Sequence, residues 1–121
     1  MDIKISEMMQ MQRELYKKHQ HSWEPMTHEY AKDSLLYMIE EVGECIAILK
    51  KKGSQAIMED PSVRTAFVTE MSDVLMYYHD VLLRLGYSHE DISQAYVKKH
   101  FKNMGRDYEE EYQRLLKHED Q

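Results

Sequence analysis

Hydrophobic residues recur every three or four positions along most of the chain, which is the spacing of one face of an α-helix. In residues 3 to 20 the repeating positions are Ile3, Met8, Met11 and Leu15. In residues 28 to 52 they form a longer stripe, which consists of Ala31, Leu35, Ile39, Val42, Ile46 and Leu49. We expect each stripe to be the face by which its helix packs into the core.

A third stripe follows a short connector, SQAIMED, at residues 54 to 60. Its members are Val63, Phe67, Met71, Val74, Tyr78, Val81 or Leu82, and Leu85. Asp60 before Pro61 is typical of a helix start, and Gly86 is typical of a helix end. Gly53 suits the end of the preceding helix in the same way. The pattern therefore predicts two long helices joined by a connector.

Two shorter helices complete the prediction. Ser88 and Asp91 resemble a capping box and open a helix that reaches about Asn103. A strongly charged helix follows from about Asp107 to His118. With 121 residues and only four glycines and two prolines, the chain is expected to form a single domain over residues 1–121. The predicted fold class is all-α, a four-helix-type bundle with a polar C-terminal helix.

The charge balance limits the partners of the protein. Its formal net charge is −6, with 22 acidic and 16 basic residues, which argues against a general binder of nucleic acid polymers. Cys45 is the only cysteine, so a disulfide within the chain and a cysteine-based zinc site are excluded. The sequence has no signal peptide pattern and no run of about 20 apolar residues that would span a membrane. We expect a cytoplasmic protein that does not enter membranes.

Two pairs of carboxylates lie on the two long helices. Glu41 and Glu44 are on the side of their helix away from its apolar stripe. A solvated face would explain them, but that side also carries Tyr37, Cys45 and Ile48, and is less polar than a free surface.

Glu70 and Asp73 repeat this arrangement on the following helix, where Ala66 and Tyr77 share their side. If the two helices fold back antiparallel, both pairs lie at nearly the same height, about 14 Å from the turn at 1.5 Å per residue. Four facing carboxylates repel one another unless cations neutralise them, and all-oxygen ligands suit Mg²⁺, with Mn²⁺ as an alternative.

A di-iron site is the nearest competing metal site, since it also takes carboxylates from several helices. It normally includes Glu-x-x-His pairs. None of the seven histidines has a glutamate three residues before it, which disfavours this alternative. The sequence also lacks a P-loop, a Gly-rich dinucleotide loop and a serine nucleophile elbow.

Two acidic motifs together resemble a family signature. The first is EEVGE at residues 40–44, and the second is EMSDVL at residues 70–75. They resemble the E-E-x-x-E and E-x-x-D motifs of the MazG-like all-α nucleoside triphosphate pyrophosphohydrolases. A later stretch, from Lys99 through Lys102 and Asn103 to Arg106 and Tyr108, resembles the basic tail of that family. The resemblance covers about residues 35 to 108.

The resemblance implies hydrolysis of a nucleoside triphosphate to a monophosphate and pyrophosphate, in a housecleaning role for the nucleotide pool. Carried over by position, the metal ligands are Glu41, Glu44, Glu70 and Asp73. Glu40 and Glu41 are the catalytic candidates, and Glu40 would orient or deprotonate the attacking water.

The resemblance also implies substrate contacts and an assembly. Lys99, Lys102 and Arg106 would neutralise phosphates and Asn103 would contact the sugar or base, although a solvated basic helix end is an equal alternative. Trp23 and Tyr77 would approach the nucleotide, but either would look the same as a core residue. Members of the family are homodimers or homotetramers, and ten methionines fit such an interface or a soft core. The alternative function is a catalytically silent helical bundle that binds a nucleotide or a partner chain.

Overall fold

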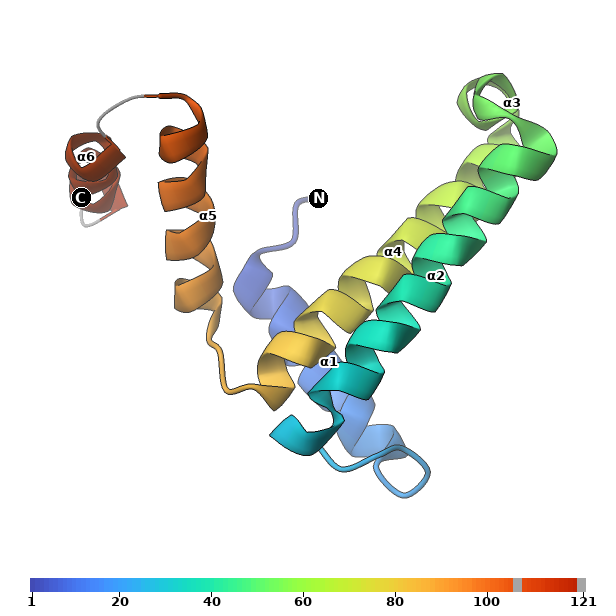
Figure 1. The fold of residues 1–121 in the computed structure, drawn as a ribbon, viewed down its shortest axis with the longest axis horizontal. Helices are drawn as coiled ribbons and strands as arrows, with labels where there is room; N and C mark the ends of the chain where they lie inside the picture. Colours follow the sequence, from blue (N-terminus) through green and yellow to red (C-terminus); the bar gives the residue numbers. More distant parts are fainter. Residues whose placement is uncertain (106–107, 120–121) are drawn as a thin grey trace. The chain divides into compact units, whose positions relative to one another are not determined.

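The structure is a computed structural model that describes residues 1–105 and 108–119. Within these ranges every regular element is helical, so the predicted all-α class is confirmed (Figure 1). The elements are α1 (Ile5–His19), the 3₁₀ helix η1 (His28–Tyr30), α2 (Ala31–Lys52), α3 (Ser54–Glu59), α4 (Pro61–Arg84), α5 (His89–Asn103) and α6 (Tyr108–Glu119). Across the described residues, no helix is long and apolar enough to cross a membrane.

The chain forms two compact units, residues 1–86 and residues 87–121. The first unit contains α1 to α4, and the second contains α5 and α6. The two units are described separately below. The single domain over residues 1–121 and the four-helix-type bundle therefore stay predictions.

Several helix ends follow the sequence signals. The Asp60 carboxylate accepts a hydrogen bond from the backbone nitrogen of Ser62 at 3.0 Å, which caps α4 in front of Pro61. Ser88 and Asp91 form the predicted capping box of α5. Gly53 ends α2 with a φ of 86°, a conformation that glycine adopts without a steric penalty.

The connector predicted at residues 54 to 60 joins the two long helices, and within it Ser54–Glu59 form the short helix α3, which was not predicted. No glycine or proline interrupts these six residues, so the backbone completes a helical turn between Gly53 and Pro61. The predicted start of the preceding helix is also shifted, since His28–Tyr30 are 3₁₀ and the α-helix begins at Ala31.

Helices α2 and α4 form an antiparallel pair and lie side by side along their lengths (Figure 1). Ser34 contacts Asp80, and the rings of Tyr37 and Tyr77 lie 6.0 Å apart. Residue numbers therefore rise along α2 as they fall along α4, which confirms the predicted fold-back. Helix α1 also packs against α4 and lies behind the pair in Figure 1.

The apolar stripe predicted as the packing face of α2 is not the face that contacts α4. Ala31 is buried, but the other five members are 38–58% exposed, and they are Leu35, Ile39, Val42, Ile46 and Leu49. The contact face consists of Ser34, Met38, Glu41, Cys45 and Ile48, which also follow a three-and-four spacing. Small or narrow side chains at Ser34 and Cys45 let two helix backbones approach closely, which explains why this face is used.

The stripes predicted for the other two helices are wrong in part. On α4, Val81 is buried, whereas Met71, Tyr78 and Leu85 are exposed. On α1, the exposed residues include Met11 and Leu15, and the buried ones are Met9 and Gln12. Each of these two helices has a wide apolar surface. The side that packs against the neighbouring helices lies about one residue position around the helix from the predicted stripe.

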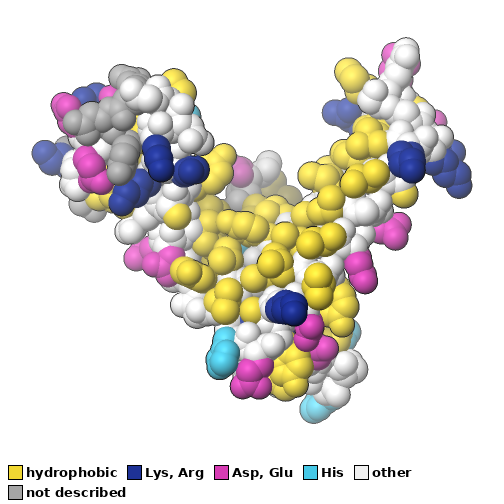
Figure 2. Space-filling model, in the orientation of Figure 1, with side chains coloured by type: hydrophobic (Ala, Val, Ile, Leu, Met, Phe, Trp, Pro, Cys, Tyr) yellow, Lys and Arg dark blue, Asp and Glu magenta, His cyan; other side chains and the backbone are white. Residues whose placement is uncertain are grey.

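The exposed stripes of α2 and α4 combine into one surface. On both helices the stripe is rotated in the same sense from the contact line, and in an antiparallel pair this brings both stripes to the same side. Figure 2 shows the hydrophobic side chains gathered along this side. We call it the apolar face, and its members are Leu35, Ile39, Val42, Ile46, Leu49, Val68, Met71, Leu75 and Tyr78.

Candidate metal centre and the adjoining pocket

Three of the four predicted metal ligands converge between α2 and α4. Oxygen atoms of Glu41, Glu70 and Asp73 all lie within 4.8 Å of one another. All three residues are half-buried. Around an octahedral Mg²⁺ ion, opposite oxygens lie about 4.1 Å apart and adjacent ones about 2.9 Å apart, given metal–oxygen distances of about 2.0–2.1 Å. The three carboxylates would therefore draw closer together to bind one such ion.

The antiparallel register explains the convergence. Glu70 and Asp73 are three residues apart on α4, so they point to nearly the same side of that helix. Glu41 lies at the matching height on α2 and faces them from the contact side. The fold therefore concentrates negative charge at one point of the helix pair.

The electrostatics of the triad are unfavourable without a cation. Desolvation raises the pKa of Glu41, and a hydrogen bond to Glu70 and the negative charges of Asp73, Glu70 and Glu44 raise it further. Burial and the charges of Glu70 and Glu41 also raise the pKa of the Cys45 thiol. A group whose charged form is disfavoured in this way gains from a bound cation, which fits a divalent ion at this position.

The remaining two motif glutamates lie outside the triad. Glu44 is exposed and contributes to the local negative charge, but its oxygens are not among the converging group. Glu40 is also exposed, and it lies about 100° around α2 from Glu41. Metal binding by the motif and a role of Glu40 toward water stay predictions.

A pocket of about 340 Å³ adjoins the triad within the first unit. Asp73 belongs to both the triad and the pocket wall. The wall also includes Trp23, Tyr37, Tyr77 and Met76, so it is largely aromatic and apolar. The complete lining is Gln12, Leu15, Ser22, Trp23, Glu24, Ser34, Tyr37, Asp73, Met76, Tyr77, Asp80 and Arg84. Its volume lies within the range of small-molecule sites.

Two predicted nucleotide contacts, Trp23 and Tyr77, are part of this wall. The Trp23 ring stacks on His19 with ring centres 5.0 Å apart, and it remains partly exposed. Burial and nearby negative charges, led by Glu41, raise the pKa of Tyr77, so its hydroxyl keeps its proton and can donate a hydrogen bond. Both residues can therefore meet a ligand, and their nucleotide contact stays a prediction.

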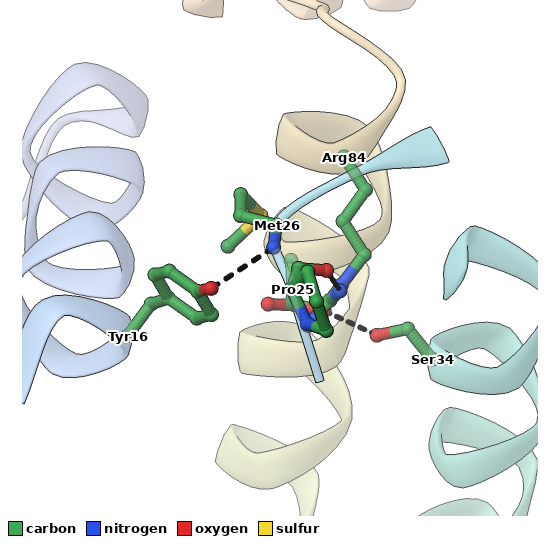
Figure 3. Close-up of polar contacts among 6 residues, drawn as sticks. Tyr16, Pro25, Met26, Ser34 and Arg84 are labelled. Atoms are coloured by element: carbon green, nitrogen blue, oxygen red, sulfur yellow. Dashed lines mark hydrogen bonds and ion pairs between the residues drawn. The ribbon is translucent and has the colours of Figure 1, made fainter. Parts of the chain in front are cut away.

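The floor of the pocket is a buried polar cluster (Figure 3). The Arg84 Nε donates to Asp80 Oδ2 at 2.7 Å, and the Ser34 hydroxyl donates to the same oxygen. Arg84 Nη1 also donates to the backbone oxygen of Pro25. The Tyr16 hydroxyl accepts from the backbone nitrogen of Met26 at 3.0 Å. These bonds tie the loop of Trp23 to α1 and α4, so the pocket has a fixed wall on that side.

The predicted basic contacts belong to the second unit. Lys99, Lys102 and Asn103 are exposed on α5. Arg106 lies outside the described residues. The phosphate and sugar contacts of these residues stay predictions.

The sequence analysis missed Gln12, Ser34, Asp80 and Arg84 as pocket residues. A signal was present on α4, because Asp73, Tyr77, Asp80 and Arg84 follow one another by four, three and four positions and so share a helix face. Ser34 precedes Glu41 by seven residues on α2, which also places the two on one face. Polar residues at helical spacing indicate a shared polar face of a helix, just as apolar residues at that spacing indicate the face that packs into the core.

The chain was compared with known proteins. It matches no protein-family model, and no curated protein and no solved structure matches it significantly. The arrangement of the residues themselves is thus the basis for the function proposed below.

Proposed function

We propose that the protein is a cytoplasmic Mg²⁺-dependent nucleoside triphosphate pyrophosphohydrolase of the MazG-like type, which cleaves a triphosphate to a monophosphate and pyrophosphate. The observation that carries the proposal is the position of the triad of Glu41, Glu70 and Asp73 at the edge of an aromatic pocket. Such a pair of sites matches a substrate that has a charged phosphate end and a flat ring end.

The residues of the chain have separate tasks in this proposal. Glu41, Glu70 and Asp73 hold Mg²⁺, which offsets their mutual repulsion, and Glu44 would join them through a second ion or a water. Bound Mg²⁺ supplies neutralisation of phosphate charge and a more acidic water. Glu40 would orient that water, and Lys99, Lys102, Asn103 and Arg106 would contact the phosphates and sugar. Trp23 and Tyr77 would position the nucleoside.

Hydrolysis of a panel of triphosphates tests the proposal directly. We expect release of pyrophosphate with Mg²⁺ and none after chelation. Glu41→Gln and Asp73→Asn should each lower kcat at least about 100-fold, because each removes charge that holds the ion near the reacting phosphate. Glu29→Gln is the matched control, since Glu29 is an exposed carboxylate outside the triad, and it should keep full activity.

The same experiment separates the proposal from its rival, a catalytically silent protein that binds a nucleotide. If triphosphates raise the melting temperature with Mg²⁺ but no pyrophosphate appears, the rival is correct. Full activity in Glu41→Gln or Asp73→Asn would overturn the proposed mechanism. All three triad positions carry carboxylates, which supports the enzyme over the silent protein.

We also propose that the protein self-associates as a homodimer or homotetramer through the apolar face. Its nine residues are each about 40–60% exposed. With about 150–250 Å² for a large side chain, they expose about 700–800 Å² in total. A stable interface takes about 800 Å² from each partner, so one face of this size suits a second copy that brings the same face. The nine members of the apolar face are all hydrophobic, which favours their burial.

Sedimentation analysis tests the assembly. Ile39→Glu places a charge at the most exposed α2 position of the apolar face, and we expect it to shift the protein to a monomer. Lys51→Glu is the control, because it adds negative charge at an exposed position on the side of α2 away from the apolar face. A wild-type protein that sediments as a monomer at micromolar concentration would overturn self-association.

A further inference from the structure

The pocket floor contains two polar groups that have no complete set of partners. Gln12 is only 7% exposed, lines the pocket, and makes no hydrogen bond within the described part of the chain. Asp80 is only 3% exposed, and both of its hydrogen bonds, from Ser34 and Arg84, go to Oδ2. Its Oδ1 has no hydrogen bond from any described residue, although Asp80 also lines the pocket.

Buried polar groups without partners are costly, at about 1–3 kcal/mol each. Both groups are accessible from the pocket. Among the described residues, the side-chain atoms that are fully enclosed and have no hydrogen-bond partner are the two ring nitrogens of His79, and no atom of Gln12 or Asp80 is among them. A ligand in the pocket can therefore meet both groups. A ligand that displaces water from these two groups must offer matching partners, or it leaves a buried polar group unpaired.

The position of the floor fits the distal edge of a nucleobase. Asp80 lies seven residues beyond Asp73 on α4, which is about 10.5 Å along the helix at 1.5 Å per residue. This separation is roughly the length of a nucleoside. With phosphates at the triad and the ring between Trp23 and Tyr77, the ring edge farthest from the sugar meets Asp80 and Gln12.

The chemistry of the floor favours one class of base. The Asp80 carboxylate pairs with the Arg84 guanidinium, and its remaining oxygen is an acceptor, so the ring atom that meets it must be a donor. The exocyclic amino group of cytosine or adenine is such a donor, and the ring nitrogen beside it can accept from the Gln12 amide. A uracil or thymine ring held in the same place would set its keto oxygen, which is not a donor, against the carboxylate.

We propose that Gln12 and Asp80 read the base and select an amino-substituted pyrimidine or purine nucleotide over a keto-substituted one. This inference rests on the proposed function for the placement of the phosphates. It adds residues and a substrate class that the acidic motifs do not specify. Neither Gln12 nor Asp80 belongs to those motifs.

Binding of nucleoside monophosphates tests the inference apart from hydrolysis. We would measure dCMP, dAMP, dUMP and TMP with the wild-type protein by calorimetry, and the four matching triphosphates by pyrophosphate release. The wild-type protein should favour the amino nucleotides by about 10- to 100-fold, the cost of one unpaired buried polar group. Equal affinities, or a preference for dUMP or TMP, would overturn the inference.

The variant Gln12→Met removes the amide while it keeps the side-chain volume. We expect it to lower the amino-to-keto affinity ratio, because the ring nitrogen loses its donor while the contribution of Asp80 remains. Gln10→Met is the matched control, because Gln10 is exposed on the same helix and does not line the pocket, and it should keep the wild-type ratio. An unchanged ratio in Gln12→Met would overturn the role of Gln12.

Asp80→Asn supplies a second variant. An asparagine amide can donate to a keto oxygen, so the preference should move toward dUMP and TMP. If no triphosphate is cleaved but the amino preference and its decrease in Gln12→Met are found, the enzyme proposal fails and the base selection stands. If triphosphates are cleaved without preference, the base selection fails and the enzyme proposal stands. No binding of any nucleotide would overturn both.

Discussion

The helix pair of α2 and α4 carries two groups of carboxylates that differ in how their charge is balanced. Asp80 is almost completely buried, but the Arg84 guanidinium and the Ser34 hydroxyl compensate its charge within the fold. Glu41, Glu70 and Asp73 are less buried, yet no basic side chain of the described residues forms an ion pair with them. The chain itself balances the charge of the first group, and no described basic side chain balances the charge of the second.

This difference distinguishes a carboxylate whose charge the fold balances from carboxylates whose charge it leaves unbalanced. A carboxylate that the fold compensates contributes to the packing of two helices and a loop. Carboxylates that the fold brings together without compensation weaken the free protein, which is expected only where a ligand restores the balance. Substitutions in the two groups should therefore change stability in opposite directions.

Loss of the Arg84 guanidinium, which balances the charge of Asp80, should have the largest effect. Arg84→Met leaves the buried Asp80 carboxylate unpaired and removes the bond to Pro25, and we expect a loss of about 3–5 kcal/mol in the free energy of unfolding. Urea unfolding measures it. Arg64→Met, at an exposed position of α4, should change stability by less than about 0.5 kcal/mol. Equal small effects would show that the Asp80 charge is not compensated by Arg84.

The pH dependence at His79 should have an intermediate effect. His79 precedes Asp80 on α4 and is buried. Neither of its ring nitrogens has a hydrogen-bond partner among the described residues. Burial lowers its pKa below the ordinary 6.5, so the unfolded chain binds a proton that the folded protein does not. Stability should fall as the pH drops below about 6.5, with a slope of at most about 1.4 kcal/mol per pH unit.

The variant His79→Leu tests this dependence. It should flatten the part of the stability curve between about pH 7 and pH 5 that belongs to His79, as measured by urea unfolding at each pH. The exposed His28 gives the control, because His28→Leu should leave the curve unchanged. A curve that stays as steep in His79→Leu as in the wild-type protein would contradict the assignment.

Removal of a triad carboxylate should have the smallest effect, and with the opposite sign. Glu41→Gln relieves repulsion from Glu70 and Asp73, so the metal-free protein should gain about 0.2–1 kcal/mol. Millimolar Mg²⁺ should also raise the melting temperature of the wild-type protein, and it should not raise that of Glu41→Gln. Thermal unfolding with and without Mg²⁺ measures both. A destabilised Glu41→Gln without metal would show that the triad is already compensated.

Much of the local structure was predictable from the sequence because local signals act over a few residues. Asp60 with Pro61, Ser88 with Asp91, and Gly53 each place a helix end by backbone chemistry that needs no distant partner. The convergence of Glu41 with Glu70 and Asp73 was predictable from their distance to the turn. The short helix α3 was missed because a six-residue segment has too little periodicity to reveal a helix.

The packing faces and the pocket floor were not predictable in the same way. α2 has two faces with three-and-four spacing, and hydrophobicity favours the one that the structure leaves exposed. Likewise, nothing near Gln12 in the sequence shows that it lies beside Asp80 on the floor of one pocket. Both depend on how three helices approach one another.

The sequence by itself determined the helical class, most helix ends and the two acidic motifs, because helix propensity, capping and periodicity are properties of neighbouring residues. The tertiary structure alone decided which face of α2 meets α4, which carboxylates converge, and that Asp80 is compensated by Arg84. These depend on close packing and on electrostatics over short distances, which bring together residues that are far apart in the chain. Within the first unit, the same packing leaves the apolar face of α2 and α4 exposed.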